Sequence, residues 1–441
     1  MTTIGSGKLW VQPSSLLSLV DQVDQFARQS GLVTRYSHRF SPAGFLICLL
    51  RAVTSGHTTL SSMATLLADT GLKPMSRQSM CNRLSERSTD FLQKVLQFLL
   101  DRELRSSLGP TVRDSLPFKR VILEDSTTLP MGLGNRANYP GAGGNGRSAG
   151  AKLRMVIDLL SSKVLAISRH SGANPDQSLC DHVLESCTAG DLIVRDMGFF
   201  CLGSLKRLSD KGVRWLTRLP ASTSARTLDG TSLYDLLRSS KSQVIDCEIV
   251  IGGSRNSKPI TARLVAKRVP KEIAERNRRE RNRKSTSMGK TPSAQSNERA
   301  GWTIMVTDVP ASEVAAADLL SLYSQRWMVE IVFRAIKGTA HIDQALRLKR
   351  RKVHQDAIIL SIAIVAVLEL AEFTFRKSKI PKNAKRQFSV EKVCRVLGHY
   401  LLSLTGPIKK WPPFQPDERS ITSRKRADRL TLYEKAIYAL S

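Results

Sequence analysis

Two apolar stretches in the last third of the chain carry its clearest hydrophobic pattern. In the first, the twelve residues from Ala357 to Leu368 are apolar except for one serine and lie between Asp356 and Glu369. A helix that crosses a membrane needs roughly 20 apolar residues. This shorter run therefore predicts a helix buried inside the protein.

The second stretch, Tyr323 to Lys337, predicts a helix with a narrow polar stripe. At about 100° per residue, five side chains lie within roughly 80° of one another: Tyr323, Arg326, Glu330, Arg334 and Lys337. Apolar residues cover most of the remaining circumference, and such a helix is normally buried. The stripe is either a solvated face with a Glu330–Arg334 ion pair or a functional site, since buried charges need partners.

Residues 1–115 have the apolar spacing of helices. The predicted helices are Pro13–Arg28, Phe45–Val53, Thr59–Ala68, Ser76–Arg87 and Phe91–Leu104. A turn at 70–72 between the third and the fourth gives this pair the layout of a helix-turn-helix, whose second helix enters a major groove. Polar residues suited to reading DNA lie on that second helix: Arg77, Gln78, Asn82 and Arg83. An ordinary helical hairpin is the alternative.

From Phe118 the pattern changes to that of strands. Strands are predicted over Arg120–Leu129, Lys152–Leu160, Lys163–Arg169, Asp191–Asp196 and Gly212–Leu219, with helices over Asp176–Cys187 and Phe199–Ser209. The glycine-rich segment 132–150 reads as a loop. This order describes an α/β fold, a mixed sheet flanked by helices, over residues 116–219.

Residues 220–300 interrupt this region with a β-rich insertion. Two strands, Gln243–Ile251 and Lys258–Val269, precede the basic run Lys271–Lys284 and the Ser/Thr/Gly/Pro-rich segment 285–296. The basic run is either a solvated surface helix or an arm that contacts phosphates. A strand over Gly301–Val309 returns to the sheet, so residues 301–375 complete the fold begun at 116. Residues 376–441 predict a basic, helical C-terminal region.

The charge of the chain changes the picture of its partners. Its 441 residues carry 68 Lys and Arg against 38 Asp and Glu, a net charge of +30. Such a field attracts a polyanion, so double-stranded DNA or another nucleic acid is the expected partner, with an anionic membrane as the rival. The seven cysteines form no zinc or redox spacing. The first twenty residues lack the pattern of a signal peptide, and we expect a cytoplasmic protein.

Three carboxylates stand out by their position. Asp125 ends the first predicted strand, Asp196 ends a later one, and Glu330 lies on the charged stripe. Ligands of open sheets gather at strand ends, and three gathered acids repel unless a cation lies among them. Mg²⁺ prefers carboxylate oxygens, and two such ions can activate a nucleophile and stabilise a leaving oxygen in phosphodiester cleavage. Arg326 and Lys337 would then bind neighbouring phosphates.

Other acids compete for these roles. Alternation along the strand points Glu124 to the opposite face from Asp125. The remaining competitors, Asp158, Asp191 and Asp308, lie within or at the ends of strands. A turn or a helix cap would explain any one aspartate taken alone, so the proposed site depends on the three acids and the basic stripe together.

The stripe has the form Y-x2-R-x3-E-x6-K, with Tyr323, Arg326, Glu330 and Lys337 in register. This resembles the signature of the insertion-sequence-four family of DDE transposases. The segment Asp125-Ser-Thr resembles the family's first aspartate motif, and Asp196-Met-Gly-Phe resembles its second. The resemblance is strong over about 120–340 and rests on architecture alone in the flanks.

The resemblance implies a ribonuclease-H-like core split by a β-strand insertion. Asp125, Asp196 and Glu330 would ligate Mg²⁺, for which Mn²⁺ substitutes, while Tyr323, Arg326 and Lys337 would contact transposon-end DNA. Members of the family cut at element ends and join the 3′-hydroxyl to target DNA as a synaptic homodimer. Some pass through a DNA hairpin, in which a tryptophan of the insertion holds a flipped base. This chain has no tryptophan between 220 and 300; Trp302 and Trp215 are the nearest.

Two other classes of protein stay open at this stage. One is a catalytically inactive DNA-binding descendant of such an enzyme, which the intact set of acids disfavours. The other is a basic RNA- or membrane-associated protein. The absence of stacking aromatics at RNA-binding spacing and of a membrane-spanning segment argues against it.

Overall fold

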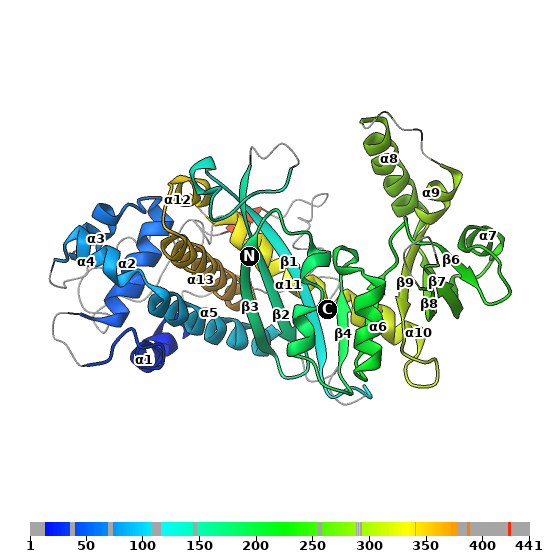
Figure 1. The fold of residues 1–441 in the computed structure, drawn as a ribbon, viewed down its shortest axis with the longest axis horizontal. Helices are drawn as coiled ribbons and strands as arrows, with labels where there is room; N and C mark the ends of the chain where they lie inside the picture. The colour runs from blue at the N-terminus through cyan, green and yellow to red at the C-terminus, as the bar shows by residue number, and fades with distance from the viewer. Residues whose placement is uncertain are drawn as a thin grey trace, which may run out of the picture.

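A computed structural model of the chain describes residues 14–35, 40–68, 74–107, 116–143, 148–253, 258–287, 289, 291, 293–339, 341–377, 386–388 and 422–424. Figure 1 shows an elongated molecule, with N-terminal helices at one end, a broad sheet in the middle and the helical pair α8–α9 projecting at the other end.

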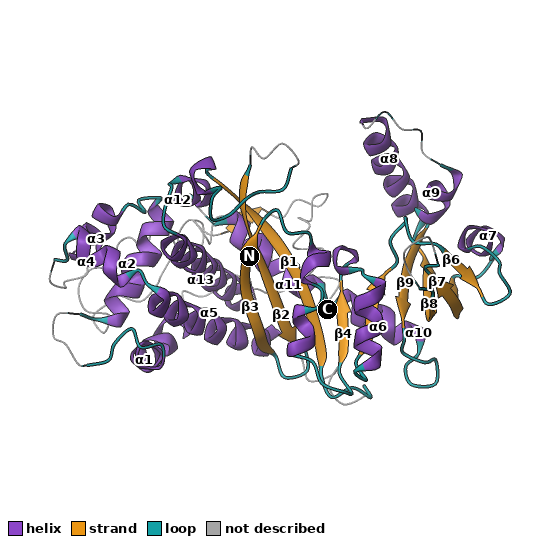
Figure 2. Ribbon diagram, viewed as in Figure 1, coloured by secondary structure: helices purple, strands orange, loops and turns teal. Residues whose placement is uncertain are grey.

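A single mixed sheet of nine strands runs through the molecule (Figure 2). Its order is β3 (Lys163–Ser171), β2 (Ala149–Asp158), β1 (Val121–Met131), β4 (Leu192–Arg195), β5 (Arg214–Arg218), β9 (Trp302–Thr307), β8 (Ile260–Arg268), β7 (Val244–Ile251) and β6 (Ala225–Thr227). The pairs β1–β4 and β4–β5 are parallel, and the other pairs are antiparallel. The predicted α/β class with a large mixed sheet is confirmed.

The strands predicted for the insertion do not form a separate sheet. Along the chain they lie between β5 and β9, as expected. In space, β9 pairs with β5 on one side and with β8 on the other. Thr307 is opposite Leu216 in one pairing and opposite Arg263 in the other, so β9 joins the insertion strands to the central sheet.

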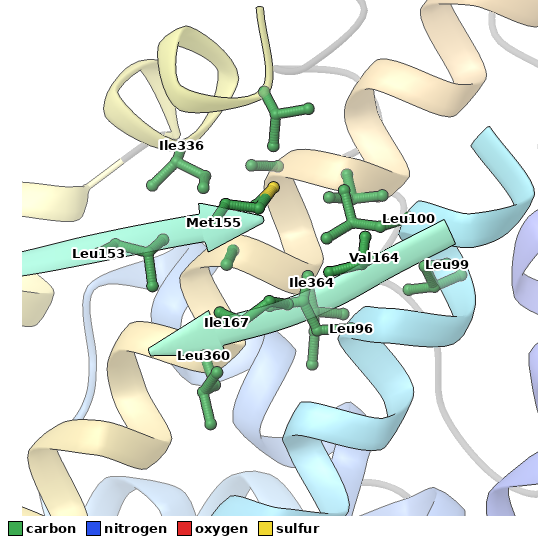
Figure 3. Packing of buried hydrophobic residues seen from close by; sticks show 14 of the residues in the cluster. Leu96, Leu99, Leu100, Leu153, Met155, Val164, Ile167, Ile336, Leu360 and Ile364 are labelled. Carbon is green, nitrogen blue, oxygen red and sulfur yellow. The ribbon is translucent and has the colours of Figure 1, made fainter. Parts of the chain in front are cut away.

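One face of the central strands is covered by helices from both ends of the chain. These are α1 (Ser14–Gln29), α2 (Pro42–Ser55), α5 (Glu86–Ser107), α10 (Ala316–Ser324), α11 (Trp327–Gly338), α12 (Ile342–Arg347) and α13 (Lys352–Lys377). Figure 3 shows Leu96 of α5 and Leu360 of α13 gathered around Val164 and Ile167 of β3, while Met155 of β2 lies toward Ile336 of α11. Every residue from Ala357 to Leu368 is buried. Lys352–Ala371 is long and apolar enough to cross a membrane, but 94% of its most apolar window is buried inside the protein, as predicted for a core helix.

The other face of the sheet carries shorter elements. They are η3 (Asp176–Leu179), η4 (His182–Glu185), η5 (Met197–Phe199), α6 (Leu202–Asp210) and α7 (Leu233–Ser239); η2 (Leu133–Asn135) follows β1. The single helix predicted over Asp176–Cys187 is wrong. Arg195 Nη2 and Ser204 Oγ both donate to the Cys180 carbonyl, at 2.6 and 3.3 Å. That oxygen is therefore taken by side chains, and Leu184 N donates to Asp181 O instead.

The N-terminal helices agree with the prediction apart from their bounds. The pair suggested as a helix-turn-helix is α3 (Leu60–Ala68) and α4 (Arg77–Arg83), and its turn at 70–72 lies outside the described residues. Arg83 points inward, since its guanidinium carbon lies 4.0 Å from the Phe40 ring centroid. The other three residues of α4 considered as DNA readers are exposed: Arg77, Gln78 and Asn82.

The basic run forms helix α8 (Lys271–Ser287), so it takes the helical form that was one of the two considered from the sequence. Helix α9 (Ala294–Arg299) begins inside the Ser/Thr/Gly/Pro-rich segment, with the Ser293 side chain accepting from Ser296 N. Most of the C-terminal region predicted to be helical lies outside the described residues. Beyond the end of α13 at Lys377, its described pieces are two paired strands instead, β10 (Arg386–Phe388) and β11 (Thr422–Arg424).

Candidate active site

Parallel pairing of β1 with β4 brings the two aspartates together. Glu124 is the register partner of Arg195, so Asp125 and Asp196 are the next residues on adjacent strands. Neighbours two residues before each, Leu123 and Val194, belong to the core beneath the helices, which shows that this face of the sheet is the helical one. The expectation that Asp125 ends its strand is wrong, because β1 stays paired with β2 as far as Met131. Strand β4, by contrast, stops at Arg195, directly before Asp196.

The charged stripe is built from two helices rather than one. Helix α10 ends at Ser324 and α11 begins at Trp327, while Gln325 and Arg326 between them keep right-handed helical dihedrals. The apolar face of α11 is buried as predicted, through Met328, Val329, Val332, Phe333 and Ile336. Helix α11 packs against α13 and β1, and Arg326, just before it, reaches Asp125 of β1.

Arg326 is the centre of the cluster. Its Nη1 donates to Asp125 Oδ2 at 2.8 Å, and its Nη2 contacts Glu330 Oε1 and lies 4.0 Å from Asp196 Oδ1. Only 8% of this arginine is exposed. Tyr323 Oη donates to Asp196 Oδ1 at 3.3 Å, so four of the stripe and strand residues predicted from sequence surround one guanidinium.

Lys337 and Arg334 lie farther along the same helix. Arg334 Nη2 is 3.9 Å from Glu330 Oε2, and its guanidinium carbon is 5.1 Å from the Trp327 ring centroid. Lys337 is exposed in the last turn of α11. The structure therefore brings together five of the six residues singled out from sequence and leaves Lys337 at the rim.

The environment of Asp125 disfavours its charged form. Burial raises its pKa to about 7, and the charges of Asp196 and Glu330 act in the same direction, while Arg326 and the Ser126 backbone N–H act against them. Burial also raises the pKa of the Tyr323 phenol well above its ordinary value. A carboxyl held near neutrality among other acids is a feature of functional sites.

The competing acids each have a structural partner instead. Asp191 accepts from Arg120 Nε at 3.0 Å and from Thr188 N at 2.7 Å. Asp308 accepts from Trp215 N at 2.8 Å and from Ser209 Oγ at 2.6 Å. Asp158 caps the β2–β3 turn through Leu160 N at 3.1 Å. These contacts explain all three aspartates without a ligand.

One group beside the site was missed from sequence. Asp176 Oδ1 accepts from Ser126 Oγ at 2.6 Å and from Lys152 Nζ at 2.5 Å, directly behind Asp125. The glycine of Asp196-Met-Gly-Phe belongs to the same group, because a Cβ at Gly198 would lie 2.6 Å from Asp176 Oδ2. A glycine at this motif position indicates that another group packs closely against the backbone. The sequence does not identify that group as Asp176.

The donor set fits a divalent cation. Three carboxylates supply hard oxygen ligands of the kind that Mg²⁺ and Mn²⁺ bind. Arg326 supplies a single positive charge against three negative ones, which leaves room for two further charges when all three acids are ionised. Among the residues described, the acids are joined through this guanidinium and are not packed closely enough to form a ready cluster of metal ligands.

A basic surface extends from this site toward the insertion. Arg218 is exposed at the end of β5, and its neighbour Leu219 accepts from Arg299 Nη2 at 2.8 Å. Burial lowers the pKa of Arg299 to about 10, and the positive charges of Arg281 and Arg218 add to the effect. In the described part of the chain these three arginines have no acidic partner, and Arg281 and Arg299 donate instead to the carbonyls of Ser296 and Leu219.

Sequence comparison relates the chain to one family of known proteins. Residues 116–366 match the family described as "Transposase DDE domain". A transposase for insertion sequence element IS231B from Bacillus thuringiensis subsp. berliner is 23% identical, with 88% of this chain and 84% of the relative covered. A transposase for element IS231D from subsp. finitimus is 24% identical over the same shares. A transposase for element IS1151 from Clostridium perfringens is 22% identical over 70% of this chain and 68% of the relative.

Proposed function

The chain belongs to the DDE transposase family, and from this premise we propose that it moves a bacterial insertion sequence by cutting and joining DNA. It binds the two ends of the element, cleaves there and joins the freed 3′-hydroxyl to target DNA. One observation carries the proposal: acids from two strands and a helix converge on a single buried arginine at the point where β4 ends.

In this proposal Asp125, Asp196 and Glu330 hold the divalent metal. Bound Mg²⁺ supplies activation of the attacking oxygen and stabilisation of the leaving oxygen. Asp125 and Asp196 are fixed by the sheet, and Glu330 is delivered by α11. The strand order β3-β2-β1-β4-β5, with β2 antiparallel to both its neighbours, supports the ribonuclease-H-like core expected for such a site.

The proposed DNA contacts surround these acids. Arg326 has a planar guanidinium suited to phosphate oxygens, and Tyr323 lies beside it as a further donor. Lys337 is exposed on the same helix and reaches a phosphate farther along the strand. The positive surface continues toward α8 through Arg218, Arg281 and Arg299. We therefore propose that the phosphate backbone of an end duplex runs from the acids to the insertion.

A tryptophan wedge is not part of the proposal. Trp302 is 4% exposed, its indole N–H donates to Glu298, and Arg268 stacks on its ring at 4.2 Å from the centroid. Trp215 is 1% exposed within the sheet. Both side chains are committed to packing, so neither is free to hold a flipped base.

The proposal extends to the assembly, the location and the regions of the chain. Two copies pair the element ends in a synaptic homodimer, in the cytoplasm at the nucleoid. Residues 1–115 read the end sequence through α4, residues 116–219 and 301–375 form the catalytic core, and residues 220–300 hold the duplex. The basic region 376–441 adds to DNA binding.

Alanine variants of the three acids test the proposal. Asp125→Ala, Asp196→Ala and Glu330→Ala are expected to abolish Mg²⁺-dependent cleavage of an end duplex while binding to that duplex stays within about threefold of wild type. Asp318→Ala serves as the matched control, because Asp318 is an exposed carboxylate on the neighbouring helix α10. Cleavage that survives in all three variants would overturn the assignment. Binding without cleavage in the wild type would favour an inactive descendant.

A further inference from the structure

A buried group of charges lies on the reverse face of the sheet, one residue before each proposed metal-binding aspartate. Glu124 precedes Asp125, and Arg195 precedes Asp196. The two are register partners in the last parallel pair of β1 and β4. Their side chains point away from the cluster around Arg326, because successive residues of a strand face opposite sides.

Short contacts join these side chains across the strands. Glu124 Oε2 lies 2.6 Å from Arg195 Nε, and Glu124 Oε1 accepts from Arg154 Nε at 2.6 Å. Arg154 comes from β2, on the other side of β1. One carboxylate therefore binds two arginines from two different neighbouring strands, and none of the three residues is more than 3% exposed.

Arg195 is also held from its far end. Its Nη2 donates to Cys180 O at 2.6 Å, and its Nη1 donates to Ser204 Oγ at 3.4 Å. Its side chain thus bridges Glu124 to the η3–η4 segment and to α6. Breaking a buried ion pair by removing one partner is strongly destabilising, and this pair joins β4 to β1 at their last paired residues.

We propose that Glu124, Arg195 and Arg154 are positioning residues, a clasp that sets the separation of the carboxylates of Asp125 and Asp196. The clasp acts through the backbone, since each aspartate is bonded directly to a clasped residue. It rests on the proposed function in one respect, namely that these two aspartates bind the metal. It predicts that loosening the clasp weakens metal binding even though no clasp residue touches the ion.

The same two strands carry a second clasp that serves as a control. Arg120 and Asp191 are joined at 2.5 Å, and Asp191 is fully buried. Each immediately precedes a residue of the first parallel pair, Val121 and Leu192. This far clasp joins β1 to β4 at the end of the pairing that is distant from Asp125 and Asp196, so its loss should cost stability without moving the aspartates.

The experiment compares Glu124→Gln with Asp191→Asn in the full chain. The glutamine keeps the shape of the side chain and removes the charge that the two arginines share, and the asparagine does the same at the far clasp. Mn²⁺ affinity is measured by calorimetric titration without DNA, and thermal unfolding is measured beside it. Changes in residues that orient metal ligands typically cost 10–100-fold in affinity.

We expect Glu124→Gln to weaken Mn²⁺ binding by about tenfold or more and Asp191→Asn by less than about twofold, although both lower the unfolding temperature. Wild-type Mn²⁺ affinity in Glu124→Gln, or equal losses in both variants, would overturn the clasp. If Glu124→Gln does not fold, Arg195→Lys replaces it. The lysine keeps the charge but cannot bridge Glu124 and Cys180 O with a planar fork, and the same two outcomes decide.

Asp125→Ala and Asp196→Ala separate failure of the clasp from failure of the proposed function. Loss of Mn²⁺ binding in both, with full binding in Glu124→Gln, would reject the clasp and leave the metal site intact. Full binding in both alanine variants would reject the metal site itself, and the clasp with it.

Discussion

Replacing the motif glycine Gly198 by alanine tests how the second aspartate segment is held. The new Cβ would lie 2.6 Å from Asp176 Oδ2, where ordinary contacts begin at 3.4 Å, so the carboxylate must retreat by about 3.4 − 2.6 = 0.8 Å. Asp176 Oδ1 then cannot keep its contacts at 2.6 Å to Ser126 Oγ and 2.5 Å to Lys152 Nζ. A hydrogen bond to a charged group contributes about 1.5–3 kcal/mol, and we expect Gly198→Ala to destabilise the protein by roughly that amount.

The matched control is Gly203→Ala, five residues along the chain. Gly203 lies inside α6, and its nearest neighbour, Arg207 Nη1, is the end of a flexible side chain at 3.4 Å. Alanine there should stabilise the helix by about 0.5–1 kcal/mol, because glycine loses more backbone freedom on folding. Urea unfolding followed by tryptophan fluorescence measures both variants.

A double-mutant cycle identifies the cause. In an Asp176→Ala background the carboxylate is gone, so the cost of Gly198→Ala should fall below about 0.5 kcal/mol, giving an interaction energy of about 1–3 kcal/mol. The reasoning is refuted if Gly198→Ala unfolds like Gly203→Ala, or if its cost is the same with and without Asp176.

Three further predictions concern the site and its surroundings. First, the pKa of Asp125 is raised to about 7 in the folded, metal-free protein, above its value in the unfolded chain. The folded protein therefore binds the carboxyl proton more tightly than the unfolded chain does. The free energy of unfolding that this proton contributes is lost as pH rises from about 4 toward 7. The unfolding free energy of Asp125→Asn relative to wild type should therefore grow from pH 5 to 7 and then level off; a difference that does not change with pH would contradict this. Second, Arg326→Ala removes one partner of a buried charge cluster and should destabilise the metal-free protein by about 3 kcal/mol, with Mg²⁺ restoring part of the loss in thermal unfolding; an effect below about 0.5 kcal/mol would speak against the cluster. Third, Arg283→Ala on the exposed face of α8 should reduce the slope of log DNA affinity against log salt concentration by about one unit. The control Arg207→Ala, at an arginine already paired with Asp181, should leave this slope unchanged. Equal slopes for the two variants would exclude a phosphate contact by α8.

The sequence predicted the elements of the core because their patterns are local. Short, mostly apolar runs bounded by polar residues located β1 to β5, and the apolar run at Ala357 located α13. The three acids could be chosen because each stands where a strand pattern stops or a buried helix carries charge. The alternation of side chains along a strand correctly predicted that Glu124 faces the opposite side of the sheet from Asp125. In the structure Glu124 forms ion pairs with two buried arginines.

The sequence could not predict what depends on distant partners. The helix expected over Asp176–Cys187 has a good local pattern, but Arg195 takes the carbonyl that its hydrogen bonding needs. The position of β9 between β5 and β8 depends on two pairings at once. The contacts of Asp176 and the clasp on the reverse face likewise join residues far apart in the chain.

The most direct test of the central claim maps a bound metal onto the chain. Fe²⁺ is added to the wild-type protein in place of Mg²⁺, and ascorbate with peroxide then generates radicals that cleave the polypeptide beside the ion. Our account predicts cuts near Asp125, Asp196 and Glu330 together, and their suppression by excess Mg²⁺. Fragments that map elsewhere, or a pattern that Mg²⁺ does not change, would contradict the claim that these three carboxylates form one metal site.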